Sequence, residues 1–358
     1  MKYGKRIREL LPSIDPLVYT NLAEPFSYVA AVGFEDRCFA FLKEALNHGA
    51  KPAKVIAIEY EPEELPNRKT EFLHLLEELD IHEKNVTWIK YQRTSPDQFD
   101  RAIESVKRIC SQYSNTLIDI SSMSKLLILQ LLQGLRFIQM NVRVVYTEAA
   151  IYYPTKQEYE QAKSRIRRSI PEFLSSGIYD VVTTYSLSSV AMQGYPTVLF
   201  GFPTFNQNLL LAAIEEAAPQ ELVIFEGIPH KSENLWRLNA IAELNNASYR
   251  YRSRPLIPVQ TFDYIETVEK LMEVYSDYQY THRFVIAPAN SKLQSVGVFF
   301  FKQMHPDVHI IYPTPRGFFK LHTDGVEAMW QISVDRFSEF LGFLREITRG
   351  DLASVNLV

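Results

Sequence analysis

The stretch Thr116–Ile128, TLIDISSMSKLLI, decides the fold. It opens with a short apolar run typical of a buried parallel strand, and from Lys125 onward it is apolar over the length of a helix. Between the two runs lies a polar loop with three serines and a lysine. Because backbone N–H groups and the helix dipole favour an anion at a helix N-terminus, the stretch predicts a strand, a phosphate-binding loop and a helix.

Strand-like and helix-like segments alternate on both sides of this stretch. The predicted strands of the first half are Tyr28–Val32, Lys54–Glu59, Val86–Tyr91, Leu117–Ile120 and Val142–Tyr146. The helical patterns between them are Cys38–His48, Arg68–Leu79, Asp97–Tyr113 and Lys125–Met140. Such alternation predicts a doubly wound parallel sheet of Rossmann-like type with right-handed crossovers.

Landmarks of the first half recur in the second half at a nearly constant offset. The pairs, each 166 to 168 positions apart, are Gly33 and Gly201, Glu59 and Glu226, Ser124-Lys125 and Ser291-Lys292, and Val142–Tyr146 and Val308–Tyr312. We therefore expect an α/β fold with two tandem Rossmann-like doubly wound parallel-sheet domains related by internal duplication. The expected domains are 1–155 and 195–358, joined by a linker region at 156–194. The alternative is one larger sheet whose strands merely look alike.

Composition bounds the function. The chain has 358 residues, which favours two domains over one core. Its net charge of −4 does not indicate nucleic acid as a partner, although it leaves that partner open. Neither a long apolar run nor a signal-peptide pattern is present, so we expect a cytoplasmic protein without a membrane partner. The two cysteines form no CxxC motif, and neither a metal nor a cofactor is predicted apart from a nucleotide ligand.

The candidate site of the first half follows from the topology of such sheets. Ligands bind beyond the carboxyl ends of the strands, where the strand order reverses. This places the loop after Gly33 beside the serine-lysine loop, where serine hydroxyls can donate to phosphate oxygens and Lys125 supplies charge. Alternatively, the serines cap the helix. The predicted ligand-binding residues are Gly33, Arg37, Glu59, Asp119, Ser121, Ser122, Ser124 and Lys125.

The second half offers a corresponding set. Its predicted ligand-binding residues are Gly201, Glu226, Asn290, Ser291 and Lys292. Glu59 and Glu226 end their strands near the place where dinucleotide folds bind ribose hydroxyls, but the GxGxxG motif is absent, so no nicotinamide or flavin site is expected. Tyr249–Arg254, YRYRSR, alternates aromatic and basic residues at strand period, which indicates a solvated strand face or a basic stripe for a polyphosphate or nucleic acid.

Two carboxylates in the first half permit catalysis as an alternative. Glu35 and Asp36 precede Arg37, and a carboxylate beside a phosphate site can serve as a general base or a metal ligand. The competing interpretation is that both are first-turn carboxylates favoured by a helix dipole. The counterpart after Gly201 lacks these charges, so any chemistry is expected in the first half.

The pattern Asp119-x-Ser121-x-x-x-Lys125 after an apolar strand resembles the signature of CARF domains, Rossmann-like sensors of cyclic oligonucleotides in prokaryotic antiviral defence. The duplication resembles the SAVED sensors, which fuse two CARF-like units. The resemblance implies that Ser121, Ser124 and Lys125 contact the ligand, joined by Ser291 and Lys292 across a pseudo-dyad. In the second half, Ala287-Pro288-Ala289 replaces the start of the motif.

The leading hypothesis is therefore a nucleotide sensor that acts with a separate effector protein, because no fused effector nuclease is recognisable. Its ligand would be a cyclic oligonucleotide or another phosphate-containing nucleotide. The alternative is a nucleotide or phosphodiester hydrolase with its active site in the first domain. A third hypothesis is a structural subunit whose pockets are vestigial.

Overall fold

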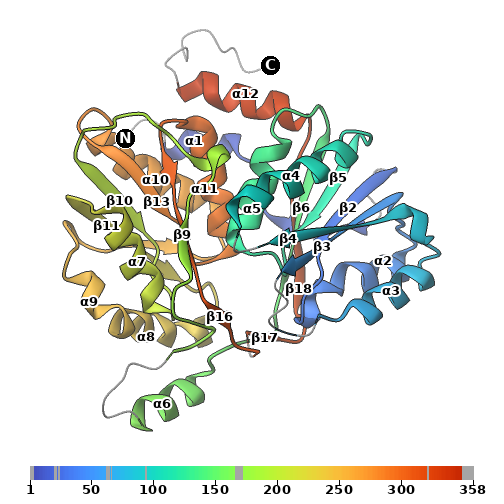
Figure 1. Ribbon diagram of the computed structural model, residues 1–358, viewed down its shortest axis with the longest axis horizontal. Coiled ribbons are helices and arrows are strands. Elements are labelled where there is room, and N and C mark those ends of the chain that lie inside the picture. Colours follow the sequence, from blue (N-terminus) through green and yellow to red (C-terminus); the bar gives the residue numbers. More distant parts are fainter. Residues whose placement is uncertain are drawn as a thin grey trace. The chain divides into compact units, whose positions relative to one another are not determined.

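The computed structural model describes residues 4–19, 22, 25–61, 65, 67–92, 95–165, 172–320 and 322–348. The chain divides into two units. We call them the seven-stranded unit, Pro12–Tyr153 and Lys320–Phe340, and the five-stranded unit, Met1–Leu11, Pro154–Phe319 and Leu341–Val358. Each is an α/β unit built on a sheet whose central strands are parallel (Figure 1).

In the seven-stranded unit the strand order is β1-β18-β6-β5-β2-β3-β4. Its strands are β1 (Asp15–Pro16), β2 (Phe26–Ala31), β3 (Lys54–Glu61), β4 (Val86–Gln92), β5 (Asn115–Asp119), β6 (Asn141–Glu148) and β18 (Ala328–Val334). A short β7 (Ile151–Tyr152) pairs with β17 (Thr323–Asp324). Its helices are α2 (Ala40–His48), α3 (Lys69–Glu78), α4 (Pro96–Cys110) and α5 (Lys125–Leu135). Strands β2 to β6 are parallel, and β18 joins the edge antiparallel to β6.

In the five-stranded unit the strand order is β12-β11-β10-β13-β14. These strands are β10 (Thr197–Gly201), β11 (Glu221–Ile228), β12 (Ile257–Gln260), β13 (Arg283–Ala287) and β14 (His309–Ile310). Two short pairs join β8 (Ser175–Ser176) to β16 (Gly317–Phe318) and β9 (Asp180–Val182) to β15 (Tyr312–Thr314). The helices are α1 (Gly4–Leu10), α6 (Lys156–Arg165), α7 (Gln207–Ala217), α8 (Trp236–Leu244), α9 (Asn246–Tyr249), α10 (Tyr264–Tyr278) and α11 (Lys292–Met304). Helix α12 (Phe337–Thr348) ends the described chain.

The two parallel sheets share one strand order. Counted along the chain from β2 and from β10, the order in both is third, second, first, fourth, fifth. In both, the order reverses between the first and the fourth strand, which are β2 and β5 in one unit and β10 and β13 in the other. The α/β fold with parallel sheets expected from the alternating pattern is confirmed.

The units differ from the expected division at residues 155 and 195. Segment Lys320–Phe340 belongs to the seven-stranded unit, because β18 pairs with β6 along its whole length. The region 156–194, expected as a linker, supplies α6, β8 and β9 to the five-stranded unit. Residues 166–171 of that region lie outside the described part of the chain.

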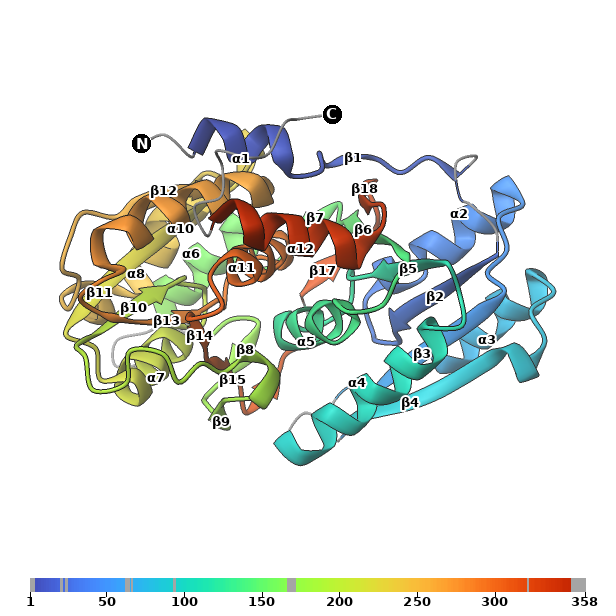
Figure 2. The ribbon, with the colours of Figure 1, turned by 90° about the horizontal axis from the view of Figure 1, so that it is seen from above.

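The alternation of side chains along β2 explains how helices cover both faces of the seven-stranded sheet. Tyr28 and Ala30 pack with apolar residues of α2 and α3, including Phe41 and Phe72. Residues of the opposite parity face the other way, where Ser27 contacts Cys110 of α4. Helices α4 and α5 lie on that face (Figure 2).

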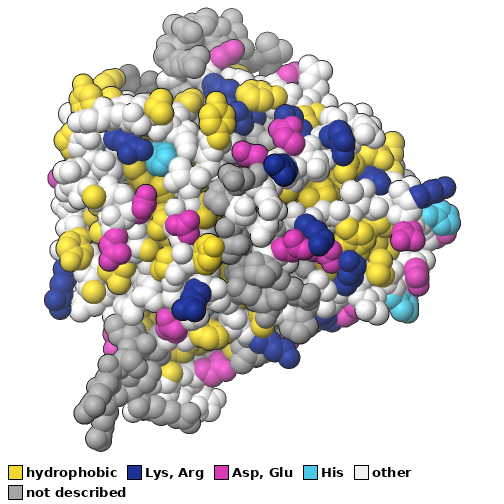
Figure 3. Space-filling model, viewed as in Figure 1, with side chains coloured by type: hydrophobic (Ala, Val, Ile, Leu, Met, Phe, Trp, Pro, Cys, Tyr) yellow, Lys and Arg dark blue, Asp and Glu magenta, His cyan; other side chains and the backbone are white. Residues whose placement is uncertain are grey.

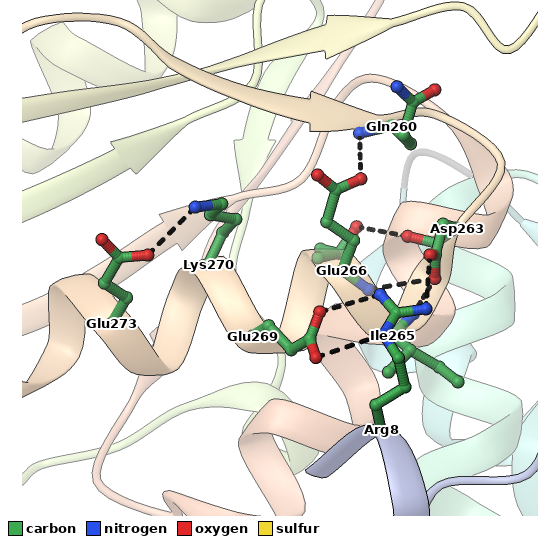
Figure 4. A network of polar contacts seen from close by, with 9 residues as sticks. Arg8, Gln260, Asp263, Ile265, Glu266, Glu269, Lys270 and Glu273 are labelled. Atoms are coloured by element: carbon green, nitrogen blue, oxygen red, sulfur yellow. Dashed lines mark hydrogen bonds and ion pairs between the residues drawn. The ribbon is translucent and has the colours of Figure 1, made fainter. Parts of the chain in front are cut away.

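Helix α1 is tied to α10 by an arginine. The guanidinium of Arg8 donates to Asp263 at 2.9 Å and to Glu269 at 2.8 Å (Figure 4). Asp263 is also the N-cap of α10 and accepts from the backbone N–H groups of Ile265 and Glu266. One carboxylate thus caps a helix and holds the first helix of the described chain.

Alanine substitutions at two helical glycines are expected to change the free energy of unfolding in opposite directions. A Cβ on Gly297 of α11 would lie 2.6 Å from the carbonyl oxygen of Tyr264 in α10, and backbone cannot yield. We expect Gly297→Ala to lower the free energy of unfolding by about 1–3 kcal/mol. Gly342 of α12 has no atom within 4 Å of such a Cβ, so Gly342→Ala should raise stability by about 0.5–1 kcal/mol. Urea unfolding followed by circular dichroism measures both, and equal effects would contradict the close α10–α11 packing.

On the face seen in Figure 3, basic and acidic side chains lie interspersed rather than in a patch of one sign. Within the described residues, no helix combines the length and apolar character needed to cross a membrane.

Candidate functional site

The candidate site lies in the seven-stranded unit, where the order of its sheet reverses. Strands β2 and β5 are neighbours, and their carboxyl ends lead into the Gly33 loop and the serine loop. A Cβ on Gly33 would lie 3.8 Å from Cβ of Ser122, and the Ser122 hydroxyl donates to the carbonyl oxygen of Ala31 at 2.6 Å. The two loops expected to meet therefore do meet.

Asp119 and Ser121 hold the serine loop in place. The fully buried Ser121 hydroxyl donates to Asp119 and accepts from the backbone N–H of Thr147 on β6 at 2.8 Å. Asp119, 1% exposed, also accepts from the Ser121 backbone N–H at 2.9 Å and from the Tyr28 hydroxyl at 3.0 Å. Burial raises the pKa of Asp119, and these donors oppose the shift. The protons of Ser121 and Ser122, predicted to reach a phosphate, are thus used inside the protein.

Ser124 is the N-cap of α5. Its hydroxyl oxygen accepts from the backbone N–H of Leu127 at 3.2 Å, which leaves the hydroxyl proton available. Its own backbone N–H donates to the hydroxyl of Tyr60 at 2.7 Å. The capping alternative is therefore confirmed for Ser124. The backbone N–H groups of Lys125 and Leu126 come next, and first-turn N–H groups have no acceptor within their own helix.

Lys125 begins α5 and is partly buried. Within the residues that the structure describes, its ammonium group has no hydrogen-bond or ion-pair partner. Burial, and next the charge of Arg37, lower the pKa of Lys125 to about 8, while Glu35 opposes the shift. A lysine in this state gains from an anion that replaces lost water and offsets the Arg37 charge.

Arg37 and Glu35 form a buried ion pair. The guanidinium Nη2 of Arg37 lies 2.9 Å from Oε1 of Glu35, and the two side chains are 6% and 9% exposed. Burial alone would lower the pKa of Arg37, but Glu35 together with Tyr146 and Tyr152 outweighs this effect, so the pKa of Arg37 is raised. Nε of Arg37 is buried without a partner in the described chain. The hydroxyls of Tyr146 and Tyr152, 2.9 Å apart, lie within electrostatic range of this guanidinium.

A segment from late in the chain holds the Gly33 loop. The Thr323 hydroxyl donates to Oε1 of Glu35 at 2.6 Å, and the backbone N–H of Gly325 donates to Asp36 at 3.4 Å. The ring of His322 meets the ring of Phe34 edge to face.

Both carboxylates proposed as general bases are held in ion pairs. Glu35 is paired with Arg37, as described above. Asp36 is paired with Arg68, whose guanidinium lowers the pKa of Asp36. Among the described residues, no group of three or more His, Cys, Asp or Glu side chains is placed to hold a metal ion.

Glu59 and Glu226, predicted as ribose contacts, differ in their surroundings. Glu59 on β3 accepts from the ammonium group of Lys69 at 2.8 Å. Glu226 on β11 is partly buried, and no hydrogen-bond or ion-pair partner occurs for it in the described chain. Burial raises the pKa of Glu226.

The other candidates of the second half lie at the carboxyl edge of the five-stranded sheet. Ser291 caps α11 in a capping box with Gln294, and its hydroxyl donates to the carbonyl oxygen of Thr261 at 2.6 Å. Lys292 is the first residue of α11. A Cβ on Gly227 would collide with the amide nitrogen of Asn290, so this glycine makes room for Asn290. At Gly201 the corresponding neighbour is Leu210, at 2.6 Å, which indicates packing.

The strand expected at Tyr249–Arg254 is wrong. Tyr249 ends helix α9, and the next residues form a turn. Tyr249 is 6% exposed and packs in the core with Ile224 and Val285, so it cannot belong to a solvated basic stripe. Tertiary packing of one aromatic ring overrode the local alternation.

A cavity of about 200 Å³ lies at the opposite edge of the seven-stranded sheet. Asn115 and Asn141, which line it, begin β5 and β6, whereas Lys125 follows the carboxyl end of β5. The cavity is therefore no part of the candidate site.

Sequence reasoning missed the tyrosines and the threonine around the two loops. Tyr60 directly follows Glu59 at the end of β3, and this position was the only local signal for it. Tyr146, Tyr152 and Thr323 reach the site through pairing of distant strands, which periodicity does not reveal.

Searches against models of protein families and against curated proteins found no match to this chain.

Proposed function

We propose that the seven-stranded unit binds a nucleotide or cyclic oligonucleotide through a phosphate at the N-terminus of α5, and that the protein is a sensor acting with a separate effector. One observation carries this proposal. Two cations, Lys125 and Arg37, lie in electrostatic range at the switch point of the sheet, and Lys125 has no partner in the described chain. Arg37 already has Glu35 as its ion-pair partner, whereas the ammonium group of Lys125 has none in the described chain and can pair with an anion.

The donors around Lys125 suit a phosphate. The hydroxyl proton of Ser124 and the backbone N–H groups of Lys125 and Leu126 belong to the same helix start. Such a helix end attracts a phosphate through these donors and through the helix dipole. Asp119 and Ser121, the other residues of the CARF-like pattern, hold the loop rather than the ligand in this proposal.

We further propose that the two units are Rossmann-like domains related by internal duplication, as in SAVED-type sensors. The common strand order supports this. So do Ser124 and Ser291, which both cap the helix after the fourth strand of their sheet. Both serine-lysine pairs stand at the same position of their helix, which is what an internal duplication would produce.

The test is direct binding. The purified protein is titrated with a panel of mononucleotides and cyclic oligonucleotides by calorimetry, and intact ligand is measured afterwards. For the ligand that binds, Lys125→Ala should weaken binding about 10- to 100-fold with the fold unchanged, because a charge-assisted contact is lost. Lys51→Ala, at the amino edge of the same sheet, is the control and should leave affinity unchanged.

The affinity should also depend on pH. A phosphodiester keeps its charge between pH 7 and 9, whereas free Lys125, with a pKa of about 8, loses its proton. We expect about tenfold weaker binding at pH 9 than at pH 7 for the wild type, and no such change for Lys125→Arg. In the absence of ligand, the effect of pH on folding stability has the opposite sign: stability rises with pH. Because the folded pKa is depressed, this residue's contribution to stability is present above about pH 10.5 and is lost as pH falls through 8.

The outcomes separate the hypotheses. Binding that ignores Lys125→Ala would remove this site, and absence of binding across the panel would leave the structural-subunit hypothesis. Turnover of a bound ligand would instead favour the phosphodiester hydrolase.

A further inference from the structure

One helical turn of the five-stranded unit carries an unusual set of buried polar atoms. Asn245, Ser248 and Tyr249 follow the spacing of three and four residues that brings side chains to one helix face. They are 1%, 0% and 6% exposed. Within the described chain, the amide oxygen of Asn245 and the hydroxyls of Ser248 and Tyr249 have no hydrogen-bond partner. Since nearly all buried polar groups in proteins are paired, three in one turn indicate a missing polar partner.

The start of this turn reaches the loop beyond the carboxyl end of β10. The amide nitrogen of Asn245 donates at 2.8 Å to the carbonyl oxygen of Thr204, in the loop that follows β10. Tyr249 packs on the sheet face formed by Leu222 and Ile224 of β11. Glu226 is the next residue of that parity on the strand, so it continues the same face toward the carboxyl edge.

Glu226 and Tyr249 are close enough to influence each other. Burial, and next the charge of Glu226, raise the pKa of Tyr249. Glu226 has no partner among the described residues, while its topological counterpart Glu59 is paired with Lys69. The nearby guanidinium of Arg252 donates to the carbonyl oxygen of Tyr249 at 2.9 Å.

The chemistry of the four groups selects a class of ligand. The carboxylate of Glu226 and the amide oxygen of Asn245 accept hydrogen bonds, and the two hydroxyls both donate and accept. An unpaired carboxylate repels phosphate but accepts well from hydroxyl groups. In dinucleotide-binding sheets, an acidic residue at the end of the second strand binds ribose hydroxyls, and β11 is the second strand of this sheet.

We propose that the five-stranded unit has its own site for a vicinal diol, such as the ribose of a nucleoside, between Glu226 and the buried face of Asn245, Ser248 and Tyr249. The diol donates to the Glu226 carboxylate, and its oxygens accept from the hydroxyls of Ser248 and Tyr249. This site is independent of the phosphate site at Lys125.

Adenosine and 2′-deoxyadenosine are the probes, titrated into the full-length protein by calorimetry. Adenosine should bind at least about tenfold more tightly, because the deoxy analogue lacks one hydroxyl of the diol. Glu226→Ala should abolish this preference and Tyr249→Phe should reduce it. Glu221→Gln, at the amino end of the same strand, should not change it. Lys125→Ala should leave adenosine binding intact, which separates this proposal from the phosphate site.

A second measurement keeps the test valid if a variant is unstable. Glu226→Gln removes a desolvated charge that has no partner in the described chain, so its melting temperature should equal or exceed that of the wild type. Equal affinity for the two probes, no saturable binding of adenosine, or an unchanged preference in a folded Glu226→Gln variant would overturn the proposal. If the three buried atoms only hold water, adenosine will not bind here and the proposal fails.

Discussion

Replacing Glu35 by alanine is expected to lower the free energy of unfolding by about 3–5 kcal/mol, because the guanidinium of Arg37 would remain buried without its anion. The Thr323 hydroxyl would lose its acceptor in the same step. Chemical denaturation followed by circular dichroism measures the loss.

Two comparisons sharpen this result. Asp36→Ala breaks the partly exposed pair with Arg68 and should cost less than about 1 kcal/mol. The double variant Glu35→Ala/Arg37→Met removes both charges and should recover much of the stability lost in Glu35→Ala. A Glu35→Ala variant as stable as Asp36→Ala would show that the ion pair does not support the fold, and would reopen a catalytic part for Glu35.

Replacing Asp119 by alanine should cost about 3 kcal/mol or more. The backbone N–H of Ser121 and the hydroxyls of Ser121 and Tyr28 would lose a buried acceptor, at about 1–3 kcal/mol for each group left unsatisfied. Asp119→Asn keeps one acceptor oxygen and should lose less. Tyr28→Phe removes one bond only and should cost about 1 kcal/mol. The same denaturation measurement applies to all three.

The Asp119 series also separates structure from recognition. If the free energy of unfolding of Asp119→Ala equals that of the wild type and only ligand binding is lost, Asp119 is a ligand contact, as the CARF-like motif would suggest. If the variant is destabilised as expected, Asp119 stabilises the serine loop, and Lys125 makes the direct contact with the ligand.

Local pattern predicted much of the fold. The apolar run before Asp119 became β5, and the helix beginning at Lys125 was confirmed, although it ends at Leu135 rather than at Met140. The meeting of the Gly33 and serine loops was also predictable, since strand alternation fixes which carboxyl ends are neighbours.

The remainder depended on pairing between distant residues. No local signal could place β18 beside β6, because the two strands are far apart in the sequence. Likewise, hydroxyl-rich composition at Ser121 and Ser122 indicated donors but not their acceptors, which are Asp119 and the carbonyl oxygen of Ala31. The Glu35–Arg37 pair could not be predicted, because two opposite charges two residues apart give the same sequence pattern whether they are solvated or buried.

The position of β18 constrains how the protein is made. The seven-stranded sheet includes residues up to Val334, so most of the polypeptide must be synthesised before all strands of that sheet can pair. Until then the edge of β6 offers unpaired backbone groups, a known route to aggregation during synthesis. A fragment released after residue 153 would keep this edge open permanently. Expression of the two halves as separate proteins should therefore yield insoluble material. Co-expression of a peptide that contains residues 320–340 should restore solubility, because this peptide supplies the strand that covers the edge of β6.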